Sequence, residues 1–167
     1  MKISLLEEYG LRCLAQLASG PGKMTIAQIA REQGLSEENT AKVMARLRAL
    51  GFVASLRGKG GGYLLARPAA QISLAEVVEK ISGCLFEIER CHTESCTHRN
   101  GCALRPVWTQ LEILVHDFLD ALSIADLTAK EAHVAITVGR RLAENDTLRL
   151  AALSRARSSS VANPSRD

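Results

Sequence analysis

The sequence has few aromatic residues and no long hydrophobic run. Phe, Trp and Tyr make up 4% of its 167 residues, and aliphatic side chains supply the apolar content, which favours helices over a β-sandwich or barrel. No stretch is long or apolar enough to span a bilayer, and the N-terminus MKISLLEEYG lacks the apolar core of a signal peptide. We therefore expect a cytoplasmic protein without membrane contact.

A strong excess of charge and an even set of cysteines are also missing. The formal net charge is only +3, so the local distribution of charge must indicate any nucleic-acid binding. Five cysteines are an odd number, which argues against a disulfide framework, and Cys13 lies at an apolar helical position where we expect a core residue. No nucleophile–base pair or phosphate-binding loop is evident, so an enzyme is not predicted.

Start and stop signals divide the first half of the chain into short elements. Ser4 with Glu7 and Thr25 with Gln28 have the spacing of capping boxes. Together with the glycine stops, they predict helices over about residues 4–18, 26–33, 36–51 and 73–83, with strands at 52–56 and 63–66. A broad apolar stripe predicts a long helix over about residues 105–122, and a last helix starts at Thr128 and reaches about residue 143.

These elements predict a mainly α fold with a small β wing, that is, a winged helix-turn-helix followed by a long dimerisation helix. The apolar face of the long helix is too wide for an exposed helix of a small domain, and a two-fold dimer matches a palindromic operator. The expected organisation is a DNA-binding domain (1–83), a cysteine loop (84–104), dimerisation and C-terminal helices (105–154) and a disordered tail (155–167).

The predicted third helix and the hairpin carry the features of a DNA-reading surface. Between Arg31 and Arg67 there are seven Lys or Arg residues against three Glu residues. A solvated helix face and an ordinary glycine-rich turn would explain each element singly, but their order favours DNA binding. The interface residues that we expect are Thr25, Ser36, Glu38, Asn39, Thr40, Lys42, Arg46, Arg48, Arg57, Lys59, Gly60 and Tyr63.

Three cysteines crowd the polar stretch CHTESCTHRNGC, at Cys91, Cys96 and Cys102. Thiolates are soft ligands that select zinc, copper(I) or iron–sulfur clusters. A zinc site would take a fourth ligand such as His92 or His98, whereas a cluster could use a carboxylate, a histidine or a residue of another chain. The spacing C-x4-C-x5-C leaves zinc and iron–sulfur as equal alternatives, with free thiols as a third.

Four segments carry a family resemblance when taken together: MKIS…EYGLRCLAQLA, MTIAQIAREQGLS…VMARLRALGFV, SLRGKGGGYLLAR, and ISLAEVVEKISG followed by the three-cysteine loop. As a set they resemble the IscR/NsrR/RirA family (Rrf-two type) of bacterial winged-helix transcriptional regulators, over about residues 1–127. The resemblance implies a homodimer that binds double-stranded DNA at a palindromic operator. Because three-cysteine members resemble iron–sulfur sensors, it also favours a cluster over zinc.

In its ligand pattern the chain is most similar to the NsrR-like sensors. Cys91, Cys96 and Cys102 match the thiolates that hold a 4Fe-4S or 2Fe-2S cluster. The four-residue first gap is shorter than in typical members, and Arg105 stands where IscR-like proteins have a ligating histidine, so an IscR-type site is not expected. NsrR-like proteins take an acidic ligand from helix one of the partner subunit, and Glu8 stands at the matching position.

Two neighbouring details complete the resemblance. Glu7 is adjacent to the matching acid but is better explained as a helix cap. IscR-like members carry a discriminating glutamate where this chain has Ala41, so switching between two promoter classes is not expected. We therefore expect a repressor controlled by a cluster that senses redox state, nitric oxide or iron supply. The alternative is a zinc-bound or metal-free regulator that responds to thiol oxidation or to a protein partner.

Overall fold

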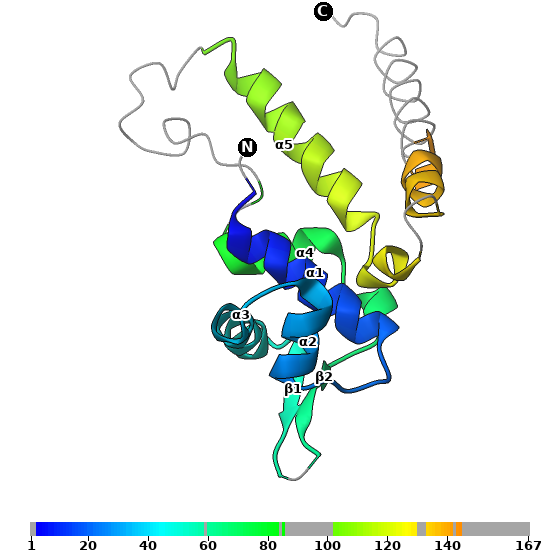
Figure 1. Ribbon diagram of the computed structural model, residues 1–167. Helices are drawn as coiled ribbons and strands as arrows, with labels where there is room; N and C mark the ends of the chain where they lie inside the picture. The colour runs from blue at the N-terminus through cyan, green and yellow to red at the C-terminus, as the bar shows by residue number, and fades with distance from the viewer. Residues whose placement is uncertain are drawn as a thin grey trace, which may run out of the picture.

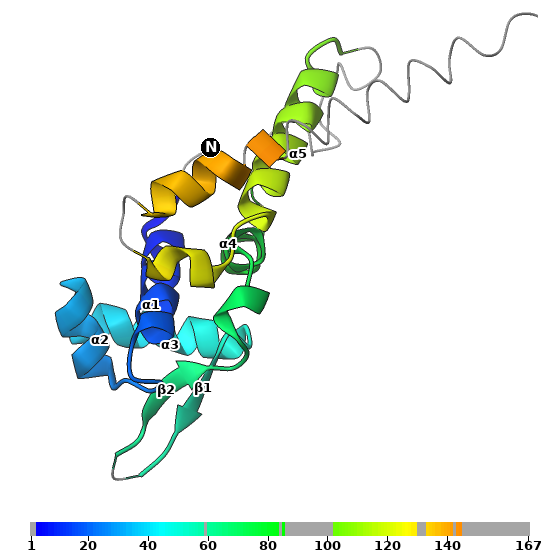
Figure 2. The same ribbon diagram turned by 90° about the vertical axis from the view of Figure 1, so that its right-hand side faces the viewer.

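The structure, a computed structural model, describes residues 3–58, 60–83, 85, 102–129, 133–141 and 143–144. The elements are α1 (Leu5–Ser19), α2 (Ile26–Gln33), α3 (Glu37–Ala49), β1 (Val53–Leu56), β2 (Gly62–Leu65), η1 (Ala69–Gln71), α4 (Leu74–Ser82), α5 (Arg105–Asp120) and η2 (Ile124–Thr128). The first four helices and the hairpin form one body, and α5 extends from its end opposite to the hairpin (Figures 1 and 2). The predicted mainly α fold with a small wing is confirmed.

Side-chain caps set the starts of the first helices, as the sequence predicts. The Ser4 hydroxyl accepts from the Glu7 amide and the Glu7 carboxylate accepts from the Ser4 amide, which completes a capping box on α1. Thr25 and Gln28 form the same arrangement on α2, where the Thr25 amide donates to the Gln28 side chain at 2.8 Å. The observed bounds of α2 equal the predicted ones, because both ends of this helix are marked by local residues.

The wing is a two-stranded antiparallel hairpin, and an isolated bridge joins its second strand to the segment before α2. Val53 pairs with Leu65 and Leu56 with Gly62 along the hairpin. Tyr63 also exchanges backbone hydrogen bonds with Met24, which precedes α2 (2.8 and 2.9 Å). The wing is therefore fixed to the connection between α1 and α2, which keeps it beside the helix-turn-helix rather than free of it.

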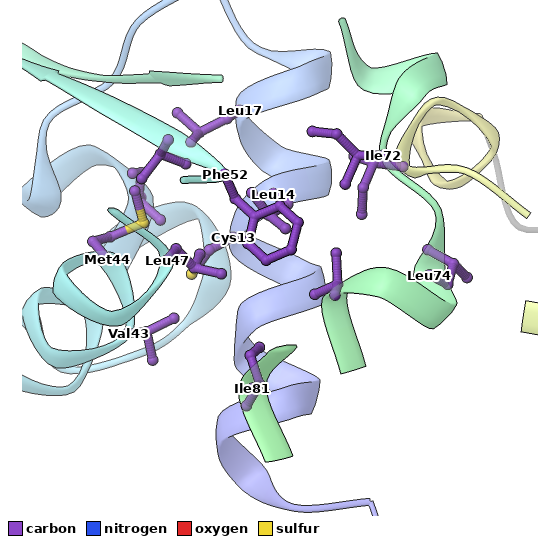
Figure 3. Close-up of a cluster of buried hydrophobic side chains, with 14 of the residues drawn as sticks. Cys13, Leu14, Leu17, Val43, Met44, Leu47, Phe52, Ile72, Leu74 and Ile81 are labelled. Atoms are coloured by element: carbon purple, nitrogen blue, oxygen red, sulfur yellow. The ribbon is translucent and has the colours of Figure 1, made fainter. Parts of the chain in front are cut away.

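One hydrophobic core joins α1, α3, α4 and the wing. Leu14 of α1, Leu47 of α3 and Phe52 before β1 are all fully buried, and Figure 3 shows them converging with Ile72 from the segment before α4. Burial of aliphatic and aromatic side chains of this size contributes roughly 1.5–3 kcal/mol each. This core fixes the relative positions of the recognition elements that surround it.

The segment before α4 and the segment after α5 differ from the prediction. Two short 3-10 turns, η1 and η2, lie side by side because Leu74 donates to the Leu122 carbonyl and Ile124 to the Ile72 carbonyl, both at 2.9 Å. The predicted helix start at Thr128 is wrong, since Thr128 ends η2; helical residues 133–141 follow. Residues 155–167, the predicted disordered tail, lie outside the part of the chain that the structure describes.

Candidate nucleic-acid interface and metal-ligand residues

The first turn of α3 presents short polar side chains to solvent. Ser36 caps the helix by accepting from the Asn39 amide at 3.2 Å, and Glu38 pairs with Lys42 at 2.7 Å one turn later. Glu38, Asn39 and Lys42 are all exposed. A capped helix with an exposed polar first turn is the form in which a recognition helix enters the major groove. The position of these three residues fits their predicted role.

Thr40 is a correction to the predicted interface. Its side chain is fully buried, and its hydroxyl donates to the Ser36 carbonyl at 2.9 Å. A hydroxyl satisfied one turn back along its own helix, with no exposed surface, cannot contact a base edge. Thr40 is therefore a core residue of α3.

The two arginines at the end of α3 point to different neighbours. Arg48 lies 3.4 Å from the Ser55 hydroxyl of β1 and remains exposed, so it joins α3 to the wing on the outer surface. Arg46 instead directs its guanidinium to the carbonyls of Lys80 and Ile81 in the last turn of α4. The structure thus engages Arg46 within the protein, which argues against the predicted contact with DNA.

The wing presents Arg57 and Gly60 to solvent at its tip. Lys59, between them, lies outside the described residues. A Cβ at Gly61 would overlap the Leu56 carbonyl oxygen and lie 3.0 Å from the Gly58 carbonyl oxygen. Gly61 is therefore needed for the hairpin's own turn.

Thr25, which caps α2, and Tyr63, in β2, both form local contacts within the protein. The Thr25 hydroxyl accepts from the Gln28 amide at 3.2 Å, although the residue is exposed. Tyr63 is half-buried and pairs with Met24 through its backbone. Both remain at the edge of the candidate interface, where they support the wing.

Glu7 and Glu8 begin α1 in opposite environments. Glu7 is buried; burial alone would raise its pKa, but hydrogen bonds from the amide and hydroxyl of Ser4 and from the Ser82 hydroxyl outweigh it and lower the pKa. The prediction that Glu7 is a helix cap is confirmed. Glu8 is exposed and, among the residues that the structure describes, pairs with Arg12 at 3.5 Å. Of the two carboxylates, that of Glu8 is thus the one that can bind a metal centre held by another protomer.

Arg12 is a residue that the sequence analysis missed. Besides Glu8, it donates to the side chain of Gln33 at 3.0 Å and to the Gln33 carbonyl at 2.7 Å. Gln33 is the last residue of α2, so Arg12 joins the candidate ligand to the helix-turn-helix. The i, i+4 spacing of Glu8 and Arg12 was the available signal.

Of the three clustered cysteines, Cys102 is described, and Cys91 and Cys96 lie outside the described residues. Cys102 is half-buried and stands three residues before α5. Cys13, by contrast, is fully buried in the core, and burial raises the pKa of its thiol to about 11. The prediction that Cys13 is a core residue is confirmed.

The donor set can be judged on its accessible members. An accessible thiol at Cys102 and an accessible carboxylate at Glu8 fit a soft centre completed by one exchangeable hard ligand. Within the residues that the structure describes, no group of three His, Cys, Asp or Glu side chains comes close enough to hold a metal ion. Glu8 and Cys102 of a single protomer therefore do not form a site with a third described donor.

A helix capable of crossing a membrane is not found in the described part of the chain. Several exposed apolar residues lie on α5 or directly before it. Leu104 and Val107 expose more than half of their surface, and a groove on this helix is lined by Pro106, Val107, Gln110, Leu111 and Leu114. The face is an apolar surface of the kind that a protein partner covers.

Comparison with known proteins agrees with this geometry. The family model described as "Rrf2: Iron-dependent Transcriptional regulator" matches residues 3–130. The HTH-type transcriptional regulator IscR of Sodalis glossinidius is 31% identical over 152 residues, which is 89% of this chain and 90% of that protein.

Two solved structures have the same fold. CymR, the global cysteine regulator of B. subtilis, superposes with a TM-score of 0.66 at 29% identity, over 77% of this chain and 96% of CymR. IscR of T. potens superposes with a TM-score of 0.62 at 29% identity, over 79% of this chain and 90% of that one. The similarity therefore extends over the winged helix and at least part of α5.

Proposed function

The chain belongs to the Rrf2 family of DNA-binding transcriptional regulators, and on that premise we propose that it is a cytoplasmic homodimer whose affinity for operator DNA is set by an iron–sulfur cluster. The observation that carries the proposal is the pair of glutamates at the start of α1. Glu7 is buried as the cap, whereas Glu8 is exposed and lies 3.5 Å from Arg12, its one ion-pair partner in the described part of the chain. An exposed carboxylate in this position is available to a second protomer.

In this proposal Cys91, Cys96 and Cys102 of one protomer and Glu8 of its partner hold a 4Fe-4S or 2Fe-2S cluster. When bound, the cluster supplies a centre that oxidants, nitric oxide or iron shortage can damage. Glu8 is the weakest ligand because carboxylate is a hard donor at a soft metal. Its release would return Glu8 to Arg12, which also holds the end of α2.

DNA is read by the exposed first turn of α3 and the wing. Ser36, Glu38, Asn39 and Lys42 face the major groove, and the remaining cations of the surface contact phosphates: Arg48, Arg57 and Lys59. Two copies related by a two-fold axis match a palindromic operator. Occupation of a promoter by this dimer would repress transcription.

A second candidate is a regulator of the same fold that responds to thiol chemistry without a cluster, or that binds zinc. The structural similarity to CymR, a global cysteine regulator, favours this alternative. The half-buried Cys102 thiol is accessible enough to react. Both candidates predict DNA binding, so only the state of the cysteines distinguishes them.

The test is anaerobic purification followed by absorption spectroscopy and metal analysis. Wild-type protein should be brown, with iron and sulfide in equal amounts, and Glu8→Ala should lose its visible absorbance faster in air. Glu38→Ala is the matched control, because Glu38 is also an exposed glutamate with an i, i+4 cation partner. Colourless protein with bound zinc would support the second candidate, and a Glu8→Ala spectrum that is as stable as the wild type would remove Glu8 from the ligands.

A further inference from the structure

The last turn of α4 is the place where the recognition helix contacts the end of another helix. The Arg46 guanidinium of α3 lies 3.5 Å from the Lys80 carbonyl oxygen and 3.4 Å from the Ile81 carbonyl oxygen. These carbonyls belong to the final turn of α4, where no later amide of the helix donates a hydrogen bond to them. The distances are long for hydrogen bonds, so attraction between the cation and the negative end of the helix dominates.

The same turn is held from α1. The Ser82 hydroxyl donates to the Val78 carbonyl at 2.8 Å and also contacts the buried Glu7 carboxylate, whose pKa this contact helps to lower. One turn along α1, a Cβ at Gly10 would lie 2.7 Å from Ile81 Cδ1, so α1 and α4 are in close contact here. Figure 3 shows the Ile81 side chain against α1. Contacts from both α1 and α3 thus meet on residues 80–82.

Arg46 therefore has contacts within the protein that DNA binding does not explain. Arg46 is in the third turn of α3, whereas the polar residues exposed for a groove are in the first turn. Its Nη2 atom, which carries two of the five guanidinium N–H groups, faces two carbonyl oxygens of the protein, although the side chain remains exposed. A positional role fits these contacts better than a contact with the duplex.

We infer that Arg46 is a positioning residue that couples the recognition helix to the end of α4, with Ser82 as the matching contact to α1. The inference rests on the proposed function, because the chain that follows α4 carries the cysteines. A change that begins in that chain and displaces the last turn of α4 would move α3 through Arg46 and the start of α1 through Ser82. Arg46 then determines how strongly the cluster state alters DNA affinity.

The experiment measures the affinity of cluster-loaded and cluster-free protein for one duplex, selected from a random-sequence pool on the wild-type protein. The ratio of the two affinities is expected to be about 5- to 150-fold for the wild type. Arg46→Ala should reduce that ratio towards one, with an unchanged dependence of affinity on salt. Ser82→Ala should reduce the ratio in part. The control Arg48→Ala should keep the ratio while it lowers the salt slope by about one.

The outcomes separate the inference from the function on which it rests. A wild-type ratio of one would overturn control by the cluster, and the coupling with it. A wild-type ratio in the expected range that Arg46→Ala retains, together with a lowered salt slope, would overturn the coupling alone and make Arg46 a phosphate contact. If the alanine variant does not fold, Arg46→Met keeps an apolar stem but removes the charge, and an undiminished ratio in that variant overturns the inference equally.

Discussion

Glu7 and Glu8 show how adjacent residues of one type acquire different functions. Glu7 faces the protein, where its carboxylate accepts a hydrogen bond from the Ser4 amide and contacts the Ser82 hydroxyl. Glu8 faces solvent and, within the described residues, forms an ion pair with Arg12. Because a buried charge must be fully hydrogen-bonded, Glu7 is committed to the fold, whereas Glu8 is free for a ligand. The helical offset of 100° between neighbours is what separates the two roles.

The lowered pKa of Glu7 predicts a pH-dependent contribution to stability. Its ordinary value is 4.5 and its folded value is lower, so the stabilisation is complete above pH 4.5 and is lost as the pH falls through the folded value. Glu7→Gln should lower the free energy of unfolding by about 1 kcal/mol at neutral pH, with a difference that shrinks below pH 4.5. Thermal unfolding at a series of pH values measures this.

Glu8→Gln is the control for that series, because it removes an exposed carboxylate one residue away. It should leave the unfolding curve near the wild-type one at every pH. A Glu7→Gln protein that follows the wild-type curve throughout would mean that the buried carboxylate contributes no charge-dependent stability.

At the level of single residues, sequence reasoning succeeded where the determining contacts are local. The caps at Ser4, Thr25 and Ser36 could be predicted because each partner lies three residues away. Thr40 was misassigned because its burial depends on the packing of α3 on the core, which no local pattern reveals. The contacts of Arg46 with Lys80 and Ile81 could not be predicted for the same reason, since these residues are more than thirty positions distant in sequence.

At the level of elements, the wing is a hairpin whose turn requires glycine, because a side chain at Gly61 would overlap the backbone. Gly61 donates its amide to the Gly58 carbonyl at 2.9 Å, and the Leu56 carbonyl occupies the place of a Cβ. The backbone cannot move away from a Cβ at Gly61 without opening the hairpin. The glycines at the tip are therefore a requirement of the wing itself, and DNA contact is assigned to its cations.

Gly61→Ala should displace the wing and weaken DNA binding at least tenfold, while the helical core keeps its fold because the tip is distant from the core. Fluorescence anisotropy with the selected duplex measures the affinity, and circular dichroism monitors the helices. The matched control is Gly139→Ala in helical residues 133–141, where a Cβ meets no atom within 4 Å. Wild-type affinity in Gly61→Ala would mean that the wing takes no part in the interface.

The short turns η1, before α4, and η2, after α5, explain why a local pattern is not sufficient for the whole fold. η1 and η2 are ordered by the backbone pairing of Ile72 with Ile124 and of Leu74 with Leu122. Neither segment carries a helix or strand period of useful length, so the sequence analysis assigned no element to either. Their packing is long-range, and so is the position of α5 that follows from it.

At the scale of the molecule, α5 is the feature that a single chain leaves incomplete. None of its described residues is buried, although Phe118 and Leu119 near its end pack against the core. Towards its start, Val107, Leu111 and Leu114 line a groove on a helix that extends away from the body (Figures 1 and 2). An apolar face continuous with the core but extending beyond it is typical of an obligate interface, which resembles a core divided between two chains.

The predicted occupant of that face is a second copy of the chain, because the proposed binding to a palindromic operator and the proposed Glu8 ligand both require one. Val107→Glu combined with Leu114→Glu should convert the protein from a dimer to a monomer in sedimentation analysis, since burial of two charges in an apolar interface costs several kcal/mol. The winged helix should keep its fold, because these side chains lie outside the core. Thr109→Glu, an exposed position outside the groove, is the control and should remain dimeric.

The same variant tests whether the parts belong to one mechanism. A monomer cannot supply Glu8 from a partner and can bind only one half-site, so the double variant should lose visible absorbance in air as fast as Glu8→Ala and bind the selected duplex with a reduced salt slope. If it is monomeric yet holds its cluster as well as the wild type, the fourth ligand lies within the protomer. If it remains a dimer, another surface forms the interface, and the exposed face of α5 requires a different partner.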